Sequence, residues 1–324
     1  MNIIEKAVEK IEKELEAELA QSADDAESFH SPASSTTPEA DTDHAGESKT
    51  ALPSGYSTDK TTPPVRAKSR AKVHSPAIHI DLERLAALGF ITPDRINTLL
   101  SEEFRHLKRL LLRRATVGKP EYLDNGNLVL LTSSLPGEGK TFNSINLAMS
   151  LALEVDRTVL LIDADVLKSD ASKTFQVSDK PGLSNYLQGD ETDLSKLLLK
   201  TNVDSLSLLP SGPQFPKLTE MLASNQMQKL VRELSSRYAD RIIIFDSPPL
   251  LSTSSASILA GLMGQVLLVI EAVRTPQSAV EAALRHIGKT DKVSILFNKQ
   301  REFSFSSYGH GYGYGYGNSH KQSG

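Results

Sequence analysis

The sequence predicts an α/β domain with a doubly wound, mostly parallel sheet over about residues 100–300. Apolar runs of four or five residues recur from Leu128 onward, and amphipathic helical stretches fill most of the gaps between them. A glycine-rich turn follows the first run. Apolar strands separated by helices indicate a parallel sheet that is covered on both faces. We therefore expect functional loops at the carboxyl ends of the strands.

The amino-acid composition limits the classes of protein to which this chain can belong. The chain of 324 residues is 39 % hydrophobic and 6 % aromatic, which predicts that part of it is disordered. It contains no cysteine, which excludes disulfides, thiol catalysis and cysteine-ligated metals. No apolar run approaches the roughly 20 residues that cross a bilayer, and the N-terminus lacks a secretory signal. The expected location is the cytoplasm.

The N-terminal arm has its own pattern. Residues 1–20 are predicted to form an amphipathic helix, which either docks or pairs with another helix or remains solvated. Residues 21–76 are rich in Ser, Thr, Pro, Ala and Asp, as is typical of a disordered linker. Residues 1–50 carry a charge balance of −9 and residues 60–114 one of +7. The basic part could contact an anionic membrane, a partner or the acidic arm, or serve only as a solvated linker.

Ordered sequence resumes near Ile78, and the domain is predicted to cover residues 78–302. Residues 81–115 have a helical pattern with a break at Thr92-Pro93. Six strands are expected after this helical segment: Leu128–Thr132, Thr158–Ile162, Leu206–Leu209, Arg241–Phe245, Val266–Ile270 and Val293–Phe297.

The turn after the first strand has the features of a phosphate-binding loop. Gly137 and Gly139 allow backbone N–H groups to turn toward phosphate oxygens, Lys140 supplies a positive charge, and Thr141 can bind Mg²⁺. The helix that starts there directs its positive end at the same phosphates. The strict motif has glycine where this chain has Ser134. The residues predicted to contact the nucleotide are Pro136, Gly137, Glu138, Gly139, Lys140, Thr141 and Phe142.

Carboxylates follow two later strands. Asp163 and Asp165 end the second strand, and Asp246 ends a later one in the run Asp246-Ser-Pro-Pro. Because the carboxyl ends of parallel strands share one edge of a sheet, we expect these acids to converge on the phosphate loop. A single Asp at a strand end is usually a turn former or helix cap, but three in this order favour Mg²⁺ binding and activation of a nucleophile.

The C-terminal segment, residues 303–324, holds four of the eight tyrosines: Tyr308, Tyr312, Tyr314 and Tyr316. Glycines separate most of them, and almost nothing else there is apolar, so the segment is predicted to be flexible and to present its tyrosines. Together with a loop that holds ATP, this tail suggests an enzyme that phosphorylates itself.

These motifs carry a family resemblance. Gly137–Thr141, Asp163-x-Asp165 and Asp246-Ser-Pro-Pro resemble the Walker A, Walker A′ and Walker B motifs of the P-loop tyrosine kinases of bacteria, in particular the autokinases of exosortase and exopolysaccharide loci. The resemblance covers about residues 78–316 and includes the tail, which the related Min-type and partition-type ATPases lack. Those ATPases also carry a lysine where this chain has Leu135.

The resemblance implies a role for each matched position. Lys140 and Thr141 would hold phosphate and Mg²⁺, and Asp165 and Asp246 would bind Mg²⁺ directly or through water. Asp163 would accept or orient the tyrosine proton. At the end of the last strand, Asn298 matches a position that contacts adenine, although Asn is also an ordinary turn residue there. The cofactors implied are ATP and Mg²⁺.

The family also has an acidic-basic helix motif at the contacts of a subunit ring. Glu102, Arg105 and Lys108 match it, with Lys108 in place of an arginine, and they could equally form pairs within one charged helix face. By resemblance, the partners are further copies of the chain, a separate inner-membrane chain-length determinant protein that would bring the kinase to the membrane, and a tyrosine phosphatase. No nucleic-acid partner is expected.

Two other interpretations compete. A Min-like ATPase would switch with nucleotide and position something at a membrane, hydrolysing ATP without labelling tyrosine. An inactive scaffold would assemble through its Gly-Tyr tail without binding nucleotide, which the intact phosphate loop argues against.

The chain departs from the family pattern at two places, which bear on the rate and the activation of the kinase. Val166-Leu167-Lys168 replaces an expected arginine, and residues 252–256 lack an acidic residue.

Overall fold

The computed structural model describes residues 75–238 and 240–300. The predicted N-terminal helix, nearly all of the linker and the tyrosine-rich tail lie outside these ranges. Ten helices are described: α2 (Leu82–Ala87), α3 (Leu99–Ala115), α4 (Lys140–Ala152), α5 (Asp170–Thr174), α6 (Leu183–Gln188), α7 (Leu194–Leu197), α8 (Leu218–Met221), α9 (Asn225–Arg237), α10 (Ser254–Leu262) and α11 (Gln277–Ile287).

The strands form one sheet of seven, in the order β3-β4-β2-β5-β1-β6-β7. Their bounds are β1 (Leu128–Ser133), β2 (Thr158–Asp163), β3 (Leu199–Lys200), β4 (Leu206–Leu209), β5 (Arg241–Asp246), β6 (Gln265–Glu271) and β7 (Val293–Asn298). All neighbours are parallel except β3 and β4. The predicted fold class is confirmed. The six expected strands are present, and the two-residue β3 is an addition.

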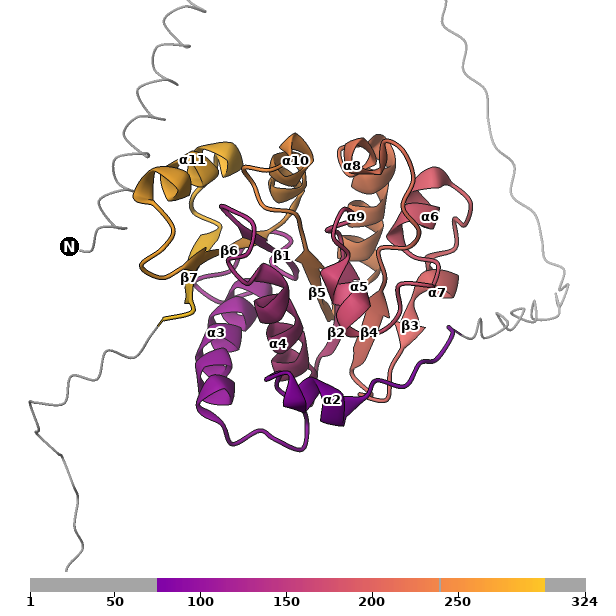
Figure 1. Ribbon diagram of the computed structural model, residues 1–324, viewed down its shortest axis with the longest axis horizontal. Helices are drawn as coiled ribbons and strands as arrows, with labels where there is room; N and C mark the ends of the chain where they lie inside the picture. The colour runs from indigo at the N-terminus through magenta and orange to yellow at the C-terminus, as the bar shows by residue number, and fades with distance from the viewer. Residues whose placement is uncertain (1–74, 239, 301–324) are drawn as a thin grey trace, which may run out of the picture.

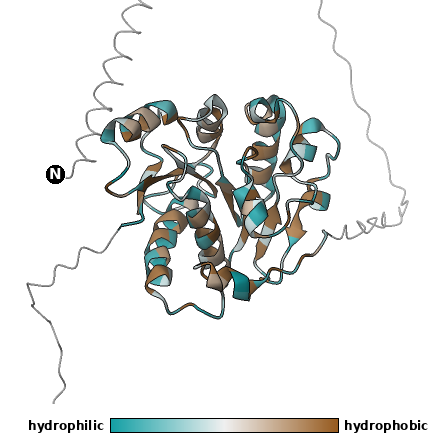
Figure 2. Ribbon diagram, in the orientation of Figure 1, coloured by the Kyte–Doolittle hydropathy of each residue, from teal (hydrophilic) through white to brown (hydrophobic). Residues whose placement is uncertain are grey.

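Two apolar cores cover the two faces of the sheet. Along β1, Leu128 and Leu130 belong to one core, and Val129 and Leu131 belong to the other, because successive strand residues point to opposite faces. Figure 1 shows α2, α3 and α4 on one side of the sheet and α9, α10 and α11 on the other. The helices carry both hydrophilic and hydrophobic residues (Figure 2), as expected for elements with one buried face.

Helix α3 is the longest described helix. Thr98 caps its first turn by accepting a hydrogen bond from the Ser101 N–H. Its apolar stripe, which includes Phe104 and Leu111, packs beside α4. The predicted break near Pro93 is present as the non-helical segment between α2 and α3. Within the described ranges, every helix is too short or too polar to span a bilayer.

Candidate active site

The phosphate loop lies between the central strand β1 and helix α4. Gly137 and Gly139 both have left-handed backbones, with φ of 88° and 96°. Gly139 needs to be glycine for a second reason, because a Cβ there would clash with the Asn298 side-chain amide. Ser134, at the position where the strict motif has glycine, is fully buried. The loop therefore keeps its tight turn around the two glycines that follow.

Lys140, the first residue of α4, is surrounded by carboxylates. Its Nζ lies 2.6 Å from Asp165 Oδ2 and 3.9 Å from Asp246 Oδ1, and it donates to Thr141 Oγ1 at 3.2 Å. Burial works to lower the pKa of Lys140, but the charges of Asp246 and Asp165 outweigh it and raise the pKa. The lysine therefore stays positively charged at the position where phosphate would bind.

The sheet register brings the predicted acids together. Asp163 ends β2 and Asp246 ends β5, and the two residues are direct partners across the parallel pair. The Ala164 N–H donates to the Asp246 carbonyl at 2.8 Å, which fixes the chain between Asp163 and Asp165. All three carboxylates are almost fully buried. Sequence spacing alone predicted this convergence, since parallel strands end at one edge.

Burial controls the protonation of these acids. Desolvation raises the pKa of Asp246, and the charge of Lys140 opposes the rise. Desolvation, reinforced by the charge of Asp246, raises the pKa of Asp163 to about 7, against hydrogen bonds from Ser172. A carboxyl group with a pKa near neutrality can exchange a proton under physiological conditions.

Asp163 presents one oxygen to the protein and keeps the other free. Its Oδ2 accepts from the Ser172 N–H at 2.8 Å and from the Ser172 hydroxyl at 2.6 Å. Its Oδ1 is buried and has no hydrogen-bond partner among the described residues. Ser172 orients the carboxylate by two hydrogen bonds, and the remaining oxygen can accept a proton.

The residues present fit one Mg²⁺ beside a nucleotide. Among the described residues, no three His, Cys, Asp or Glu side chains are arranged to hold a metal ion by themselves. The side chain of Asp246 is fully buried, and its Oδ2 lacks a partner within the described ranges. The hydroxyl of Thr141 lies at the same site. Mg²⁺ is usually held by one or two carboxylates together with substrate phosphates, so this donor set suits it without an all-protein cage.

Other predicted nucleotide contacts are placed around the loop. Pro136 and Gly137 are exposed, whereas Glu138 is buried. The ring of Phe142 packs on Phe90, with 5.1 Å between ring centroids. The side-chain amide of Asn298 donates to the Glu138 carbonyl at 2.8 Å. In this structure, the amide proposed for adenine is thus engaged with the phosphate loop.

The predicted oligomerisation residues do not share one exposed face. Arg105 and Glu102 form an ion pair of 2.6 Å on the surface of α3. Lys108 instead points into the domain, where its Nζ lies 2.6 Å from Glu154 Oε1 and donates to the Ser150 carbonyl at 3.2 Å. Each step of three residues turns the side-chain direction by about 300° around the helix axis. After the two steps from position 102 through 105 to 108, the Lys108 side chain therefore faces α4. The structure therefore places Lys108 against α4, apart from Glu102 and Arg105, and the role of these residues in oligomerisation stays a prediction.

Sequence reasoning missed several members of the site. Ser144 donates to Asp246 Oδ1 at 3.0 Å, and its place one turn after Lys140 could have revealed it. Ser172 reaches Asp163 from α5, nine residues later in the sequence, and Thr275 reaches Glu138 across 137 residues; no sequence motif identifies either residue. Lys299 donates to the Gly137 carbonyl at 2.8 Å and directly follows Asn298 in the sequence.

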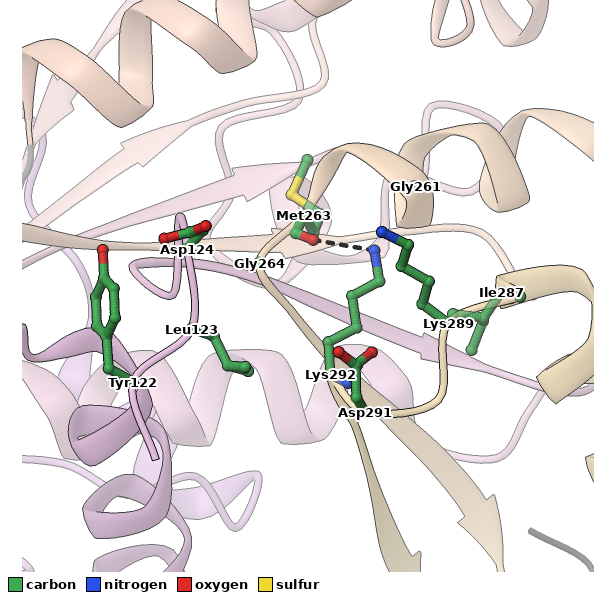
Figure 3. Close-up of a pocket in the computed structure, with 11 residues that line it drawn as sticks. Tyr122, Leu123, Asp124, Gly261, Met263, Gly264, Ile287, Lys289, Asp291 and Lys292 are labelled. Atoms are coloured by element: carbon green, nitrogen blue, oxygen red, sulfur yellow. Dashed lines mark hydrogen bonds between the residues drawn. The ribbon is translucent and has the colours of Figure 1, made fainter. Parts of the chain in front are cut away.

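A separate pocket lies at the opposite edge of the sheet, where β1, β6 and β7 begin (Figure 3). It has a volume of about 660 Å³ and is lined by Tyr122, Asp124, Lys289 and other residues. The Lys292 ammonium donates to the carbonyls of Ala260 at 2.8 Å and Met263 at 3.1 Å, which satisfies the end of α10. This pocket is not part of the phosphate-loop site.

Comparison with known proteins agrees with this geometry. The AAA domain family matches residues 129–299. Tyrosine-protein kinase CpsD of Streptococcus agalactiae serotype III is 36 % identical over 178 residues, which cover 54 % of this chain and 75 % of that protein. Tyrosine-protein kinase YwqD of Bacillus subtilis is 34 % identical over 155 residues, covering 48 % and 64 %. The longer tyrosine-protein kinase ptk of Acinetobacter johnsonii is 33 % identical, but the chain spans only 21 % of it.

Solved structures give the same result. The kinase domain of the Escherichia coli tyrosine kinase ETK superposes with a TM-score of 0.58 at 26 % identity, covering 71 % of this chain and 84 % of that chain. The BceF tyrosine kinase domain superposes with a TM-score of 0.53 at 25 % identity, covering 69 % and 91 %.

Fold and site together define a P-loop nucleotide-binding domain of the AAA type. The phosphate loop follows the central strand, and the acidic strand ends converge on its lysine. The chain belongs to the family of bacterial tyrosine-protein kinases built on this domain. The four tail tyrosines lie outside the described residues.

Proposed function

We propose that the chain is an ATP- and Mg²⁺-dependent tyrosine autokinase that phosphorylates Tyr308, Tyr312, Tyr314 and Tyr316 in the tail of a neighbouring copy. The observation that carries the proposal is the convergence of Lys140, Asp163, Asp165 and Asp246 on one phosphate loop, in a family of tyrosine kinases. The tail supplies a cluster of acceptor hydroxyls on the same chain.

Each residue has a defined role in the transfer. Lys140 and the loop N–H groups bind the β- and γ-phosphates of ATP. Thr141, Asp165 and Asp246 would hold Mg²⁺, which supplies charge neutralisation on the phosphate oxygens when it is bound. The tyrosine oxygen forms a bond to the γ-phosphorus while the bond to the β-phosphate oxygen breaks, and ADP leaves.

The tyrosine proton needs an acceptor during this step. An unperturbed tyrosine has a pKa near 10, so a positioned base assists its attack at neutral pH. Asp163 has the free, buried Oδ1 described above, and burial raises its pKa to about 7. Asp163 would therefore take the proton and release it to water when the products leave.

The tyrosine-rich tail favours transfer of the phosphoryl group from one copy of the chain to another. A tail with several tyrosines is delivered more readily to a neighbouring subunit in a ring, where Glu102 and Arg105 remain on the surface of α3. Each phosphotyrosine adds about −1.5 to −2 charge at pH 7, so a modified tail would be repelled by the acidic site and would loosen the ring. In the cell, this cycle would regulate exopolysaccharide synthesis or export, together with a membrane chain-length determinant and a phosphatase.

Two labelled copies distinguish transfer in trans from transfer in cis. Isotopically heavy chain with Lys140→Met supplies the acceptor tail, and light chain with the four tail tyrosines changed to Phe supplies the active site. After incubation with ATP and Mg²⁺, we expect phosphotyrosine on the heavy chain. The heavy chain alone is the control. ATP consumption without phosphotyrosine on either chain, or in a wild-type sample, would favour a Min-like ATPase instead.

A further inference from the structure

We infer that Asn298 and Lys299, at the end of β7, are positioning residues that aim the peptide N–H groups of the phosphate loop at bound phosphate. The inference rests on the proposed function only in taking a nucleotide as the ligand of this loop. Neither residue needs to touch the phosphate for this role, because both donate to carbonyls of the loop.

Two side chains from β7 hold two consecutive carbonyls of the loop. Lys299 Nζ donates to the Gly137 carbonyl at 2.8 Å, and Asn298 Nδ2 donates to the Glu138 carbonyl at 2.8 Å. We call these two contacts the β7 clasp. They join the edge strand of the sheet to a loop that is 160 or more residues away in the sequence.

The planarity of the peptide bond turns these contacts into an orientation of donors. In a trans peptide, the carbonyl of one residue and the N–H of the next point in opposite directions. When Lys299 holds the Gly137 carbonyl outward, the Glu138 N–H points to the inner side of the loop. Likewise, Asn298 holds the Glu138 carbonyl and turns the Gly139 N–H inward. These are the donors that a phosphate loop offers to its ligand.

A second group of contacts braces the clasp. Lys299 Nζ also lies 3.0 Å from Glu271 Oε2 at the end of β6, and the hydrogen bond from Lys299 lowers the pKa of that carboxyl. The Thr275 hydroxyl donates to the Glu138 carboxylate, whose other oxygen accepts from the Leu135 N–H at 2.7 Å. The loop is thus held through its backbone by β7 and through Glu138 by the segment after β6.

The backbone of Lys299 is itself held in an uncommon conformation. Its φ is 57°, in the left-handed region that residues other than Gly, Asn and Asp rarely enter. Such a conformation is strained for a residue with a side chain and persists where surrounding contacts determine it. Here it directs the side chain at the phosphate loop, although that side chain is 46 % exposed.

Ligand binding by purified full-length variants tests the clasp. Lys299→Gln and Asn298→Ala are titrated with Mg²⁺ and ADP, pyrophosphate or AMP by calorimetry. Losing one net hydrogen bond that orients a donor is expected to weaken ADP and pyrophosphate about 5- to 10-fold. AMP, which lacks the β-phosphate, should bind Lys299→Gln as tightly as it binds the parent chain. Glu271→Gln, which removes the brace but keeps the Gly137 contact, should weaken ADP less than Lys299→Gln.

Lys196→Gln is the matched control, because Lys196 is an exposed lysine with an ion pair of 2.9 Å to Glu191 and no contact with the loop. The inference is overturned if Lys299→Gln binds ADP as tightly as Lys196→Gln does. An equal loss of AMP affinity would also overturn it, since that result indicates general damage to the fold. Because ADP binding needs no phosphotransfer, a chain that binds ADP but never labels tyrosine would refute the proposed function and leave this test intact.

Discussion

Replacing Asp163 with Asn should change the pH dependence of folding stability in a defined direction. Burial raises the pKa of Asp163 from 3.8 to about 7 in the folded chain. The folded state therefore holds the proton more tightly than the unfolded state. Its contribution to stability is fully present below pH 3.8, falls as the pH rises, and is lost above about pH 7. Asp246 and Asp165 contribute to the raised pKa, and the Ser172 hydrogen bonds oppose it.

The size of the effect follows from the pKa difference. One pKa unit corresponds to 1.36 kcal/mol, so a titration that ends near pH 7 removes about 2–3 kcal/mol between pH 5 and pH 8. Asn does not titrate, but it places an amide where Asp163 Oδ1 has no partner, which costs about 1–3 kcal/mol at every pH. Because this cost is the same at every pH, it changes the size of the stability difference between Asp163→Asn and the parent but not the dependence of that difference on pH.

Urea denaturation at pH 5, 6, 7 and 8, without nucleotide or Mg²⁺, measures this slope. The free energy of unfolding of Asp163→Asn minus that of the parent should rise by about 2–3 kcal/mol over this range. Asp204→Asn, at an exposed aspartate, should show no such rise. A difference for Asp163→Asn that stays constant from pH 5 to pH 8 would refute the assigned pKa and its role as proton acceptor.

Three further changes have expected outcomes. Lys140→Met should abolish phosphotyrosine on immunoblots and also lower the free energy of unfolding by about 3 kcal/mol in urea, because it leaves two buried carboxylates without their cation. Gly139→Ala should prevent ADP binding in calorimetry, since the new Cβ meets Asn298 and φ is 96°; binding at the parent affinity would contradict the loop geometry. Lys108→Ala should lower the melting temperature by several degrees, because the nearly buried lysine pairs with Glu154 and donates to the Ser150 carbonyl of α4. A change in oligomeric state without loss of stability would instead return Lys108 to a subunit contact.

Much of the fold could be predicted because its determinants are local. Apolar runs between amphipathic helices identified six of the seven strands, and the shared edge of a parallel sheet predicted that Asp163 and Asp246 would meet. Strand β3 was missed because two residues, Leu199–Lys200, carry no periodicity. Its pairing with β4 depends on tertiary contacts, which a single sequence does not display.

The sequence pattern of α3 indicated that Lys108 faces the interior, but the charge of lysine favoured a surface assignment. Ser101, Phe104, Lys108 and Leu111 are buried at spacings of three and four, so position 108 belongs to the inward stripe of α3. A lysine at such a position is more readily assigned to the surface than to a buried pair. By contrast, Ser172 reaches Asp163 from the short helix α5 and Thr275 reaches Glu138 from the turn after β6, and only the three-dimensional structure reveals these contacts.

Mass spectrometry of the tail after incubation with ATP and Mg²⁺ decides whether the chain is a tyrosine autokinase. We expect phosphate on Tyr308, Tyr312, Tyr314 or Tyr316 in the wild-type chain and none in Lys140→Met. The sample should include a membrane partner's cytoplasmic segment if the chain alone is inactive. ATP hydrolysis that depends on Lys140 but leaves every tyrosine unmodified would show that the chain is an ATPase without tyrosine kinase activity.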